Sequence, residues 1–282
     1  MRIKKHSNRN EYALTHEGIW VRNLTKKNTS CIDINDLTKD DCNVFLTNEL
    51  ENSKSGYPYF EIKSQVHPKI IIISDGFNFS EHQETLASLP KDVVIIATNR
   101  SLANWKLVGE AAIKKKAINY YVANNPFPEC SRYLPKKHRY YPKCIASNRT
   151  NTDFLEKYKG EKYLYEPSYD SYYKTSLANE RYKVDDYRNP ICASISLSYH
   201  FQVEKLVLFC CDDSFEKERP GAVKLDNNMY CYPQQITSQH IMDDMCYWLK
   251  TQEIEIRDCS SGIKYTNAPY INVNELNAFF EN

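Results

Sequence analysis

The sequence is poor in the residues and motifs that most often mark a catalytic site. Only seven of its 282 residues are glycine. It has no phosphate-binding P-loop, no Gly-x-Ser-x-Gly turn and no His-Glu-x-x-His zinc motif. These absences disfavour a P-loop kinase, a serine hydrolase and a metalloprotease. Acidic and basic residues nearly cancel, with a formal net charge of +1, so no overall field attracts nucleic acid or an anionic membrane.

Long hydrophobic runs are also missing. No apolar stretch approaches the roughly 20 residues that span a bilayer. The basic N-terminus, residues 1–14, lacks the apolar core of a signal peptide. The composition is heavy in Lys, Asn, Ile and Tyr, as in many AT-rich genomes, including viral ones. We therefore expect a soluble cytoplasmic protein, or a virion-associated one if the source is a virus.

The ten cysteines form no Cys-x-x-Cys pair and match no common zinc-ligand spacing. Several, such as Cys192, Cys210 and Cys246, lie inside apolar runs. We expect them to be reduced and buried as small hydrophobic side chains.

The order of elements predicts an α/β protein. Residues 1–66 contain short mixed segments and are expected to form a small N-terminal α+β module. From residue 67, aliphatic runs alternate with helical patterns, which is typical of a doubly wound, mostly parallel Rossmann-like sheet. Strands are expected at residues 69–74, 92–98, 118–124, 204–211 and 253–259, and helices at 80–90 (with Ser80 as N-cap), 101–117, 191–201 and 236–252.

Residues 128–189 form an unusual tyrosine-rich segment. They hold eleven of the 22 tyrosines, few aliphatic residues and no strong period. The segment is expected to be an insertion within a domain of residues 67–282. One interpretation is a lid over a site, to which Tyr172 and Tyr173 would contribute. The other is a solvated connection with aromatic anchors.

In open α/β sheets, ligands bind beyond the carboxyl ends of the strands. Short polar side chains follow the expected strands, and we expect the loops that carry Gly76, Asn99 and Asn125 to border one cavity. A glycine there lets the backbone turn tightly and approach a ligand. The same glycine could serve the turn alone. The polar residues at the strand exits are Asp75, Asn78, Asn99, Asn124, Asn125, Asp212 and Asp213.

The stretches "IIISDGFNFSEHQETL", "VIIATNRSL", "YYVANNP", "HFQVEKLVLFCCDDSF" and "IEIRDCSSGIKYTNAPYINVNEL" are together similar to a known family. It is the Rossmann-like family of the archaeal 6-hydroxymethylpterin pyrophosphokinase, which includes motility-associated glycosyltransferases. The bacterial CMP-sialyltransferases are related to it. The resemblance covers residues 67–280 and rests on the order of degenerate blocks.

The resemblance implies that Asp75, Gly76, Asn78, Asn99 and Asn125 hold a nucleotide. Two departures from the family pattern matter. Its Pro-Ser turn has become Phe77–Asn78, and a carboxylate, Asp75, stands before the glycine. A carboxylate there would repel a phosphate unless it binds ribose or a metal-bridged pyrophosphate.

The resemblance also suggests where a general base would lie. The aligned position of the sialyltransferases' histidine holds Thr237, and His240 stands one helical turn away. His240 and Asp212 are therefore the catalytic candidates, and the alternative for His240 is a helix-surface or capping histidine. Tyr230 and Tyr232 could contact an acceptor substrate or could equally pack against the lid.

The resemblance favours a transferase acting on a nucleotide-activated substrate, a sialyltransferase-like glycosyltransferase ahead of a pyrophosphokinase. Its donor would be linked to CMP or UDP. The acidic pairs Asp212–Asp213 and Asp243–Asp244 could hold Mg²⁺, although such pairs are common on solvated surfaces. The alternative is a non-catalytic Rossmann-like scaffold in a homo-oligomer or a larger, viral assembly.

Overall fold

The structure is a computed structural model of the whole chain. The residues that it describes are 11–14, 20–23, 39–61, 65–76, 79–105, 117–134, 141–167, 182–212, 214, 217–218, 220–225, 229–231, 233–262 and 264–282. Among these residues, side chains are described from residue 43 onward, apart from those of residues 233, 234 and 237.

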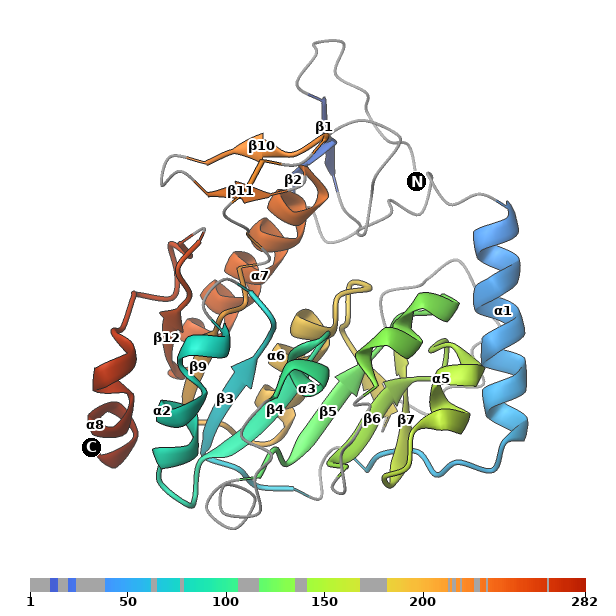
Figure 1. Cartoon of the computed structure of the whole chain (residues 1–282), viewed down its shortest axis with the longest axis horizontal. Coiled ribbons are helices and arrows are strands. Elements are labelled where there is room, and N and C mark those ends of the chain that lie inside the picture. Colours follow the sequence, from blue (N-terminus) through green and yellow to red (C-terminus); the bar gives the residue numbers. More distant parts are fainter. Residues whose placement is uncertain are drawn as a thin grey trace.

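An eight-stranded parallel sheet forms the centre of the molecule (Figure 1). Every neighbouring pair in this sheet runs parallel. This confirms the predicted α/β, Rossmann-like class. Across the sheet the strands are β12 (Glu255–Cys259), β9 (Lys205–Phe209), β3 (Lys69–Ile73), β4 (Val94–Thr98), β5 (Tyr120–Ala123), β6 (Lys143–Ser147), β7 (Lys162–Pro167) and β8 (Lys183–Val184).

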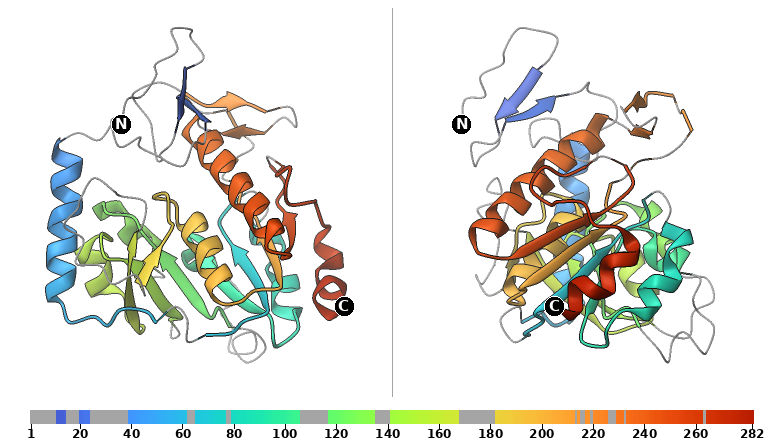
Figure 2. Two further views of the ribbon diagram at one scale, coloured as in Figure 1. Left: turned by 180° about the vertical axis from the view of Figure 1, so that it is seen from behind. Right: turned by 90° about the vertical axis from the view of Figure 1, so that its left-hand side faces the viewer.

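Helices cover both faces of the sheet, which is why its central strands are apolar throughout. Successive side chains of a strand point to opposite faces. Ile70 and Ile72 pack with α6 (Pro190–His200) and α7 (Pro233–Thr251). Figure 2 shows these two helices in the view from behind. Ile71 and Ile73 belong to the core on the other face, with residues of α2 (Gln83–Ser88), α3 (Ser101–Asn104), α5 (Thr152–Lys157) and α8 (Leu276–Glu281).

The five strands expected from aliphatic runs are present as β3, β4, β5, β9 and β12. The helix expected at residues 80–90 is shorter, because a 3-10 turn, η3 (Phe79–Glu81), precedes α2. Ser80 lies inside this turn, so its prediction as N-cap is wrong. His82 precedes α2 and makes no side-chain capping bond. Of the helix expected at residues 101–117, α3 forms the start, and residues 106–116 lie outside the described residues.

The tyrosine-rich segment contributes more regular structure than its sequence suggests. It contains the 3-10 helix η4 (Pro128–Tyr133), strands β6, β7 and β8, and α5. These strands extend the sheet beyond β5. Tyr158 and Tyr165 of this segment are fully buried, as is Tyr121 on the neighbouring strand β5. Its residues 168–181, with the proposed lid side chains of Tyr172 and Tyr173, lie outside the described residues.

The described residues also form two antiparallel strand pairs and the helix α1. Strands β1 (Glu11–Leu14) and β2 (Trp20–Asn23) pair antiparallel, as do β10 (Val223–Lys224) and β11 (Tyr230–Cys231). Helix α1 (Lys39–Lys54) lies beside α5 (Figure 1). The division of the chain at residue 66 stays a prediction, and α1 packs directly against the sheet domain.

Eight cysteines lie among the residues with described side chains. All eight are buried and none of them forms a disulfide, as expected. Within the described part of the chain, no helix combines the length and apolar character that a membrane span needs.

Candidate functional site

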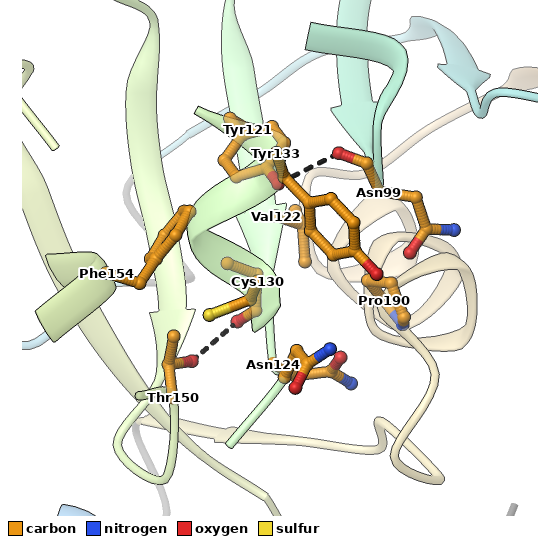
Figure 3. Close-up of a pocket in the computed structure, with 11 residues that line it drawn as sticks. Asn99, Tyr121, Val122, Asn124, Cys130, Tyr133, Thr150, Phe154 and Pro190 are labelled. Atoms are coloured by element: carbon orange, nitrogen blue, oxygen red, sulfur yellow. Dashed lines mark hydrogen bonds between the residues drawn. The ribbon is translucent and has the colours of Figure 1, made fainter. Parts of the chain in front are cut away.

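A pocket opens at the carboxyl ends of β4, β5 and β6 (Figure 3). It is small: the volume open to the centre of a water-sized sphere is about 20 Å³, which is room for a water molecule rather than a nucleoside. A larger ligand would therefore have to displace a wall residue. The lining residues are Asn99, Tyr121, Val122, Ala123, Asn124, Asn125, Cys130, Tyr133, Thr150, Phe154 and Pro190.

Asn99 forms the wall at the exit of β4. Its backbone is left-handed, with φ of 52°, a conformation that asparagine tolerates better than most residues. The hydroxyl of Tyr121 donates to the Asn99 carbonyl over 3.0 Å and so holds the turn. The Asn99 side chain donates from Nδ2 to Oγ of Ser74 over 3.2 Å.

Asn124 and Asn125 form the wall at the exit of β5. The Asn125 Oδ1 accepts from the backbone N–H of Phe127 over 2.9 Å, which makes a local turn. Its carbonyl accepts from the N–H of Asn151 over 3.0 Å. Thr150 donates from its hydroxyl to the carbonyl of Ala123 over 3.1 Å. The loops after β5 and β6 are thus tied together.

The remaining walls are uncharged. Burial raises the pKa of Tyr121 well above its usual range, and it also raises the pKa of Tyr133 and brings that of Cys130 to about 12. All three groups stay protonated at neutral pH. The pocket therefore offers neutral hydrogen-bonding groups and aromatic surface, and Tyr133 and Pro190 border it near Asn99 (Figure 3).

Gly76 does not line this pocket. Its N–H donates to the carbonyl of Cys210 over 3.0 Å, so the loops after β3 and β9 touch. A Cβ at Gly76 would collide with that carbonyl and with Oδ1 of Asp212. The glycine is thus required by the approach of two loops. The expectation of one shared cavity is met by Asn99 and Asn125 and not by Gly76.

Asp212, a predicted catalytic residue, is completely buried between two glycines. Its Oδ2 accepts from the N–H of Gly262 and from the hydroxyl of Ser214. Burial raises the pKa of Asp212. A carboxylate that holds two loops and is closed to solvent is poorly placed to take a proton from a substrate.

Asp258 on β12 is a second buried carboxyl at this end of the sheet. Burial raises its pKa to about 7, although the N–H of Ser260 donates to it and the positive charge of Lys264 lowers it. The negative charge of Asp212 adds to the upward shift.

His240, the other predicted base, is exposed on α7. The neighbouring Gln239 is buried and donates from its side chain to the carbonyl of Asp212. Gln239 therefore faces the strand ends, while His240 is not a lining residue of the pocket.

The other predicted site residues lie apart from the pocket or outside the described residues. Asp75 is partly buried, its Oδ1 accepts from the N–H of Arg100 over 3.3 Å, and burial raises its pKa. Tyr230 lies on β11. Asn78, Tyr172, Tyr173, Asp213 and Tyr232 are not described.

Four aspartates were considered as ligands for Mg²⁺. Of these, Asp213 lies outside the described residues and Asp212 is completely buried. Asp243 instead accepts from the N–H and the side-chain amide of Asn267, over 2.8 and 3.1 Å. Among the described residues, no three His, Cys, Asp or Glu side chains gather so that they could hold a metal ion.

Several pocket residues carried no signal in the sequence. Thr150 follows β6, a strand that was not expected. Tyr133 ends η4, and Pro190 is the first residue of α6. Asn124 was recognised as polar at a strand exit, but not as the member of the pair that reaches Asp186 (Nδ2 to Oδ2, 3.4 Å).

Comparison with known proteins identifies a shared fold. No protein-family model and no curated protein matches the sequence. Among solved structures, the MAf glycosyltransferase from Magnetospirillum magneticum AMB-1 is similar, with a TM-score of 0.64 and 14% sequence identity. The match covers 83% of this chain and 38% of that chain, so this chain spans well under half the length of the neighbour. At this identity the likeness concerns the fold.

Proposed function

We propose that the chain is a glycosyltransferase that binds the nucleoside part of a nucleotide-activated sugar in the pocket between Asn99, Asn124 and Asn125. The observation that carries the proposal is the convergence of three amide side chains on one uncharged, aromatic pocket at the carboxyl edge of a parallel sheet. This is the edge at which such sheets bind ligands. Amides donate and accept, so they suit a base or a ribose.

Two further points support this function. The fold is shared with a protein described as a glycosyltransferase. The sequence blocks of residues 67–280 resemble a family that includes motility-associated glycosyltransferases and is related to CMP-sialyltransferases. On this basis the donor is a CMP- or UDP-linked sugar. The pocket residues would bind its nucleoside, and neither predicted catalytic base lies among them.

A thermal-shift series tests the proposal. CMP, UMP, AMP, CMP-sialic acid and UDP-sugars are added with and without Mg²⁺. Ligand at 100 times its Kd stabilises the folded state by about 2.7 kcal/mol, which for a chain of this size raises Tm by roughly 5 °C. We expect such a rise for at least one nucleotide.

The matched variants are Asn99→Gly and Gln202→Gly. Both positions are left-handed, so glycine suits both backbones. Only the first change removes a pocket amide, and it should abolish the Tm shift while Gln202→Gly retains it. The proposal fails if no nucleotide shifts Tm, or if both variants respond like the wild type.

The second candidate function is a non-catalytic scaffold, and one observation favours it. Neither predicted base reaches the pocket: Asp212 is sealed between loops and His240 is exposed on α7. A scaffold predicts no nucleotide-dependent shift and no release of nucleotide from a donor sugar, so the same series separates the two functions.

A further inference from the structure

Asp186 is a buried carboxyl group that contacts the pocket residue Asn124. It lies between β8 and α6 and is 3% exposed. Its Oδ2 accepts from the hydroxyl of Tyr165, and its Oδ1 accepts from the N–H of Arg188, both over 2.9 Å. Both oxygens thus receive hydrogen bonds, as suits an ionised carboxylate. Burial raises the pKa of Asp186, while these donors and the charge of Arg149 lower it.

The carboxylate fixes the orientation of a pocket amide. The Asn124 Nδ2 lies 3.4 Å from Oδ2 of Asp186 and donates to it. A carboxylate has no proton to give, so the amide must turn its NH₂ group toward Asp186. The carbonyl oxygen of Asn124 then points away from Asp186, and no donor among the described residues satisfies it.

Asn99 shows the same arrangement on the facing wall. Its Nδ2 donates to Ser74, which is completely buried. Its carbonyl oxygen is left on the pocket side, near Tyr133 (Figure 3). Two walls therefore present acceptors, and a ligand group between them has to donate hydrogen bonds.

The shape and charge of the surroundings narrow the class of ligand. Tyr133 and Pro190 offer flat apolar surface, which suits a planar ring that stacks. The carboxyl group of Asp186 disfavours a phosphate at this depth, because its ionised form would repel the phosphate. A positive group, the guanidinium of Arg100, lies 5.9 Å from the centre of the Tyr133 ring, where an anionic part of the ligand could extend.

We propose that Asp186 is a positioning residue that holds the Asn124 carbonyl oxygen toward the pocket, so that the pocket selects a nucleobase bearing an exocyclic amine over one bearing a carbonyl in its place. The inference rests on the proposed nucleotide site and adds to it the chemistry by which the base is chosen.

The test compares two matched ligand pairs by isothermal titration calorimetry: CMP with UMP, and AMP with IMP. Within each pair an amine donor is exchanged for a carbonyl acceptor. The wild type should bind the amine-bearing member about tenfold more tightly, as expected when a mismatched partner leaves polar groups unpaired.

In the Asp186→Asn variant this preference should disappear or reverse. The N–H of Arg188 retains the amide oxygen of the new side chain at the Oδ1 position. Its NH₂ group then occupies the Oδ2 position and forces Asn124 to turn its own NH₂ toward the pocket. The control is Asp258→Asn, the same exchange at a completely buried carboxyl on β12, which should keep the wild-type preference.

A second variant, Asn124→Ala, tests the same inference if Asp186→Asn fails to fold. It removes the acceptor and leaves Asp186 with its two other donors, so both members of a pair should bind with similar, weaker affinity. The inference is overturned if Asp186→Asn or Asn124→Ala keeps the wild-type preference, or if the wild type binds nucleotides without one. If the wild type binds none of the four nucleotides, this inference is overturned. The proposed function fails as well if the nucleotide sugars of the thermal-shift series also leave Tm unchanged.

Discussion

At the scale of single residues, the close approach of Asp212 accounts for the glycine at position 76. The strand exit after β3 passes so close to the loop after β9 that no side chain fits between them. The sequence predicted a constrained position correctly, because a rare glycine ends the most strand-like run. It could not show whether a ligand or another loop imposes the constraint, because the neighbour comes from residues more than 130 positions along the chain.

Gly76→Ala distinguishes the two roles. Its Cβ would overlap with the Cys210 carbonyl and the Asp212 carboxylate, and overpacking of this kind costs typically 1–3 kcal/mol. We expect urea unfolding to show a loss of about 2 kcal/mol or more. Gly56→Ala is the control, because nothing lies within 4 Å of a Cβ there and only the left-handed backbone, with φ of 76°, is strained. If Gly76→Ala kept the wild-type stability but lost nucleotide binding, Gly76 would be a ligand-binding residue instead.

The buried carboxyl group of Asp258 should make the stability of the protein depend on pH. Its pKa of about 7 in the folded state lies above the usual value of 3.8, so the folded protein binds the proton more tightly than the unfolded chain does. Stability from this group therefore rises as pH falls through 7 and is lost as pH rises. Between pH 8 and pH 6 we expect a gain of about 1.4 kcal/mol, the value of one pK unit.

Asp258→Asn should remove this gain, because the amide does not titrate. Urea unfolding of the wild type and the variant at pH 6, 7 and 8 measures the difference. Parallel curves for the two proteins would show that Asp258 is not the group that titrates.

At the scale of elements, helix α1 is joined to the pocket. Asn48 and Asn52 are four residues apart and so lie on one face of the helix. Asn48 donates to the carbonyls of Pro126 and Arg149 over 2.9 and 3.2 Å. Asn52 donates to the carbonyls of Asn148 and Thr150 over 2.9 and 2.7 Å. These loops follow β5 and β6 and carry pocket residues.

Asn52→Ala should therefore weaken both fold and site. It leaves two buried carbonyls without their donor, at a cost of about 2 kcal/mol by urea unfolding. It should also lower the affinity for the nucleotide that gives the largest thermal shift, because the loop at Thr150 is no longer held. Thr152→Ala is the control: it loses only an exposed bond to Glu51 and should change stability by less than 0.5 kcal/mol. Equal affinities for wild type and Asn52→Ala would separate α1 from the pocket.

Elements with a continuous aliphatic core were predictable, and those built from tyrosine and cysteine were not. The run Ile70 to Ile73 is completely buried on both faces. A strand of this kind is recognisable in the sequence as a continuous aliphatic run. Strands β6 and β7 begin with Lys143 and Lys162. Each carries a single buried aliphatic side chain, Ile145 or Leu164, among small, aromatic or polar residues, so neither strand shows an aliphatic run. The sheet was consequently predicted without its last three strands.

At the scale of the whole molecule, the carboxyl edge of the sheet divides into two regions. Beyond β12, β9 and β3, buried carboxyls and glycines hold the loops together. Beyond β4, β5 and β6, asparagines and aromatic rings surround a pocket. Strand alternation alone placed ligand binding at this edge, through the general rule for open sheets. Which half of the edge is open depends on contacts between distant loops, and that could not be read from local sequence.

The central claim is that the nucleoside binds at the second of these regions, and a crystal structure of the protein with CMP tests it most directly. The account predicts the cytosine ring beside a displaced Tyr133, with its amine within 3.2 Å of the Asn124 carbonyl oxygen, the usual upper limit for an N–H···O bond. A CMP molecule bound instead beyond β9 and β12, against Asp212 and Gly262, would contradict it.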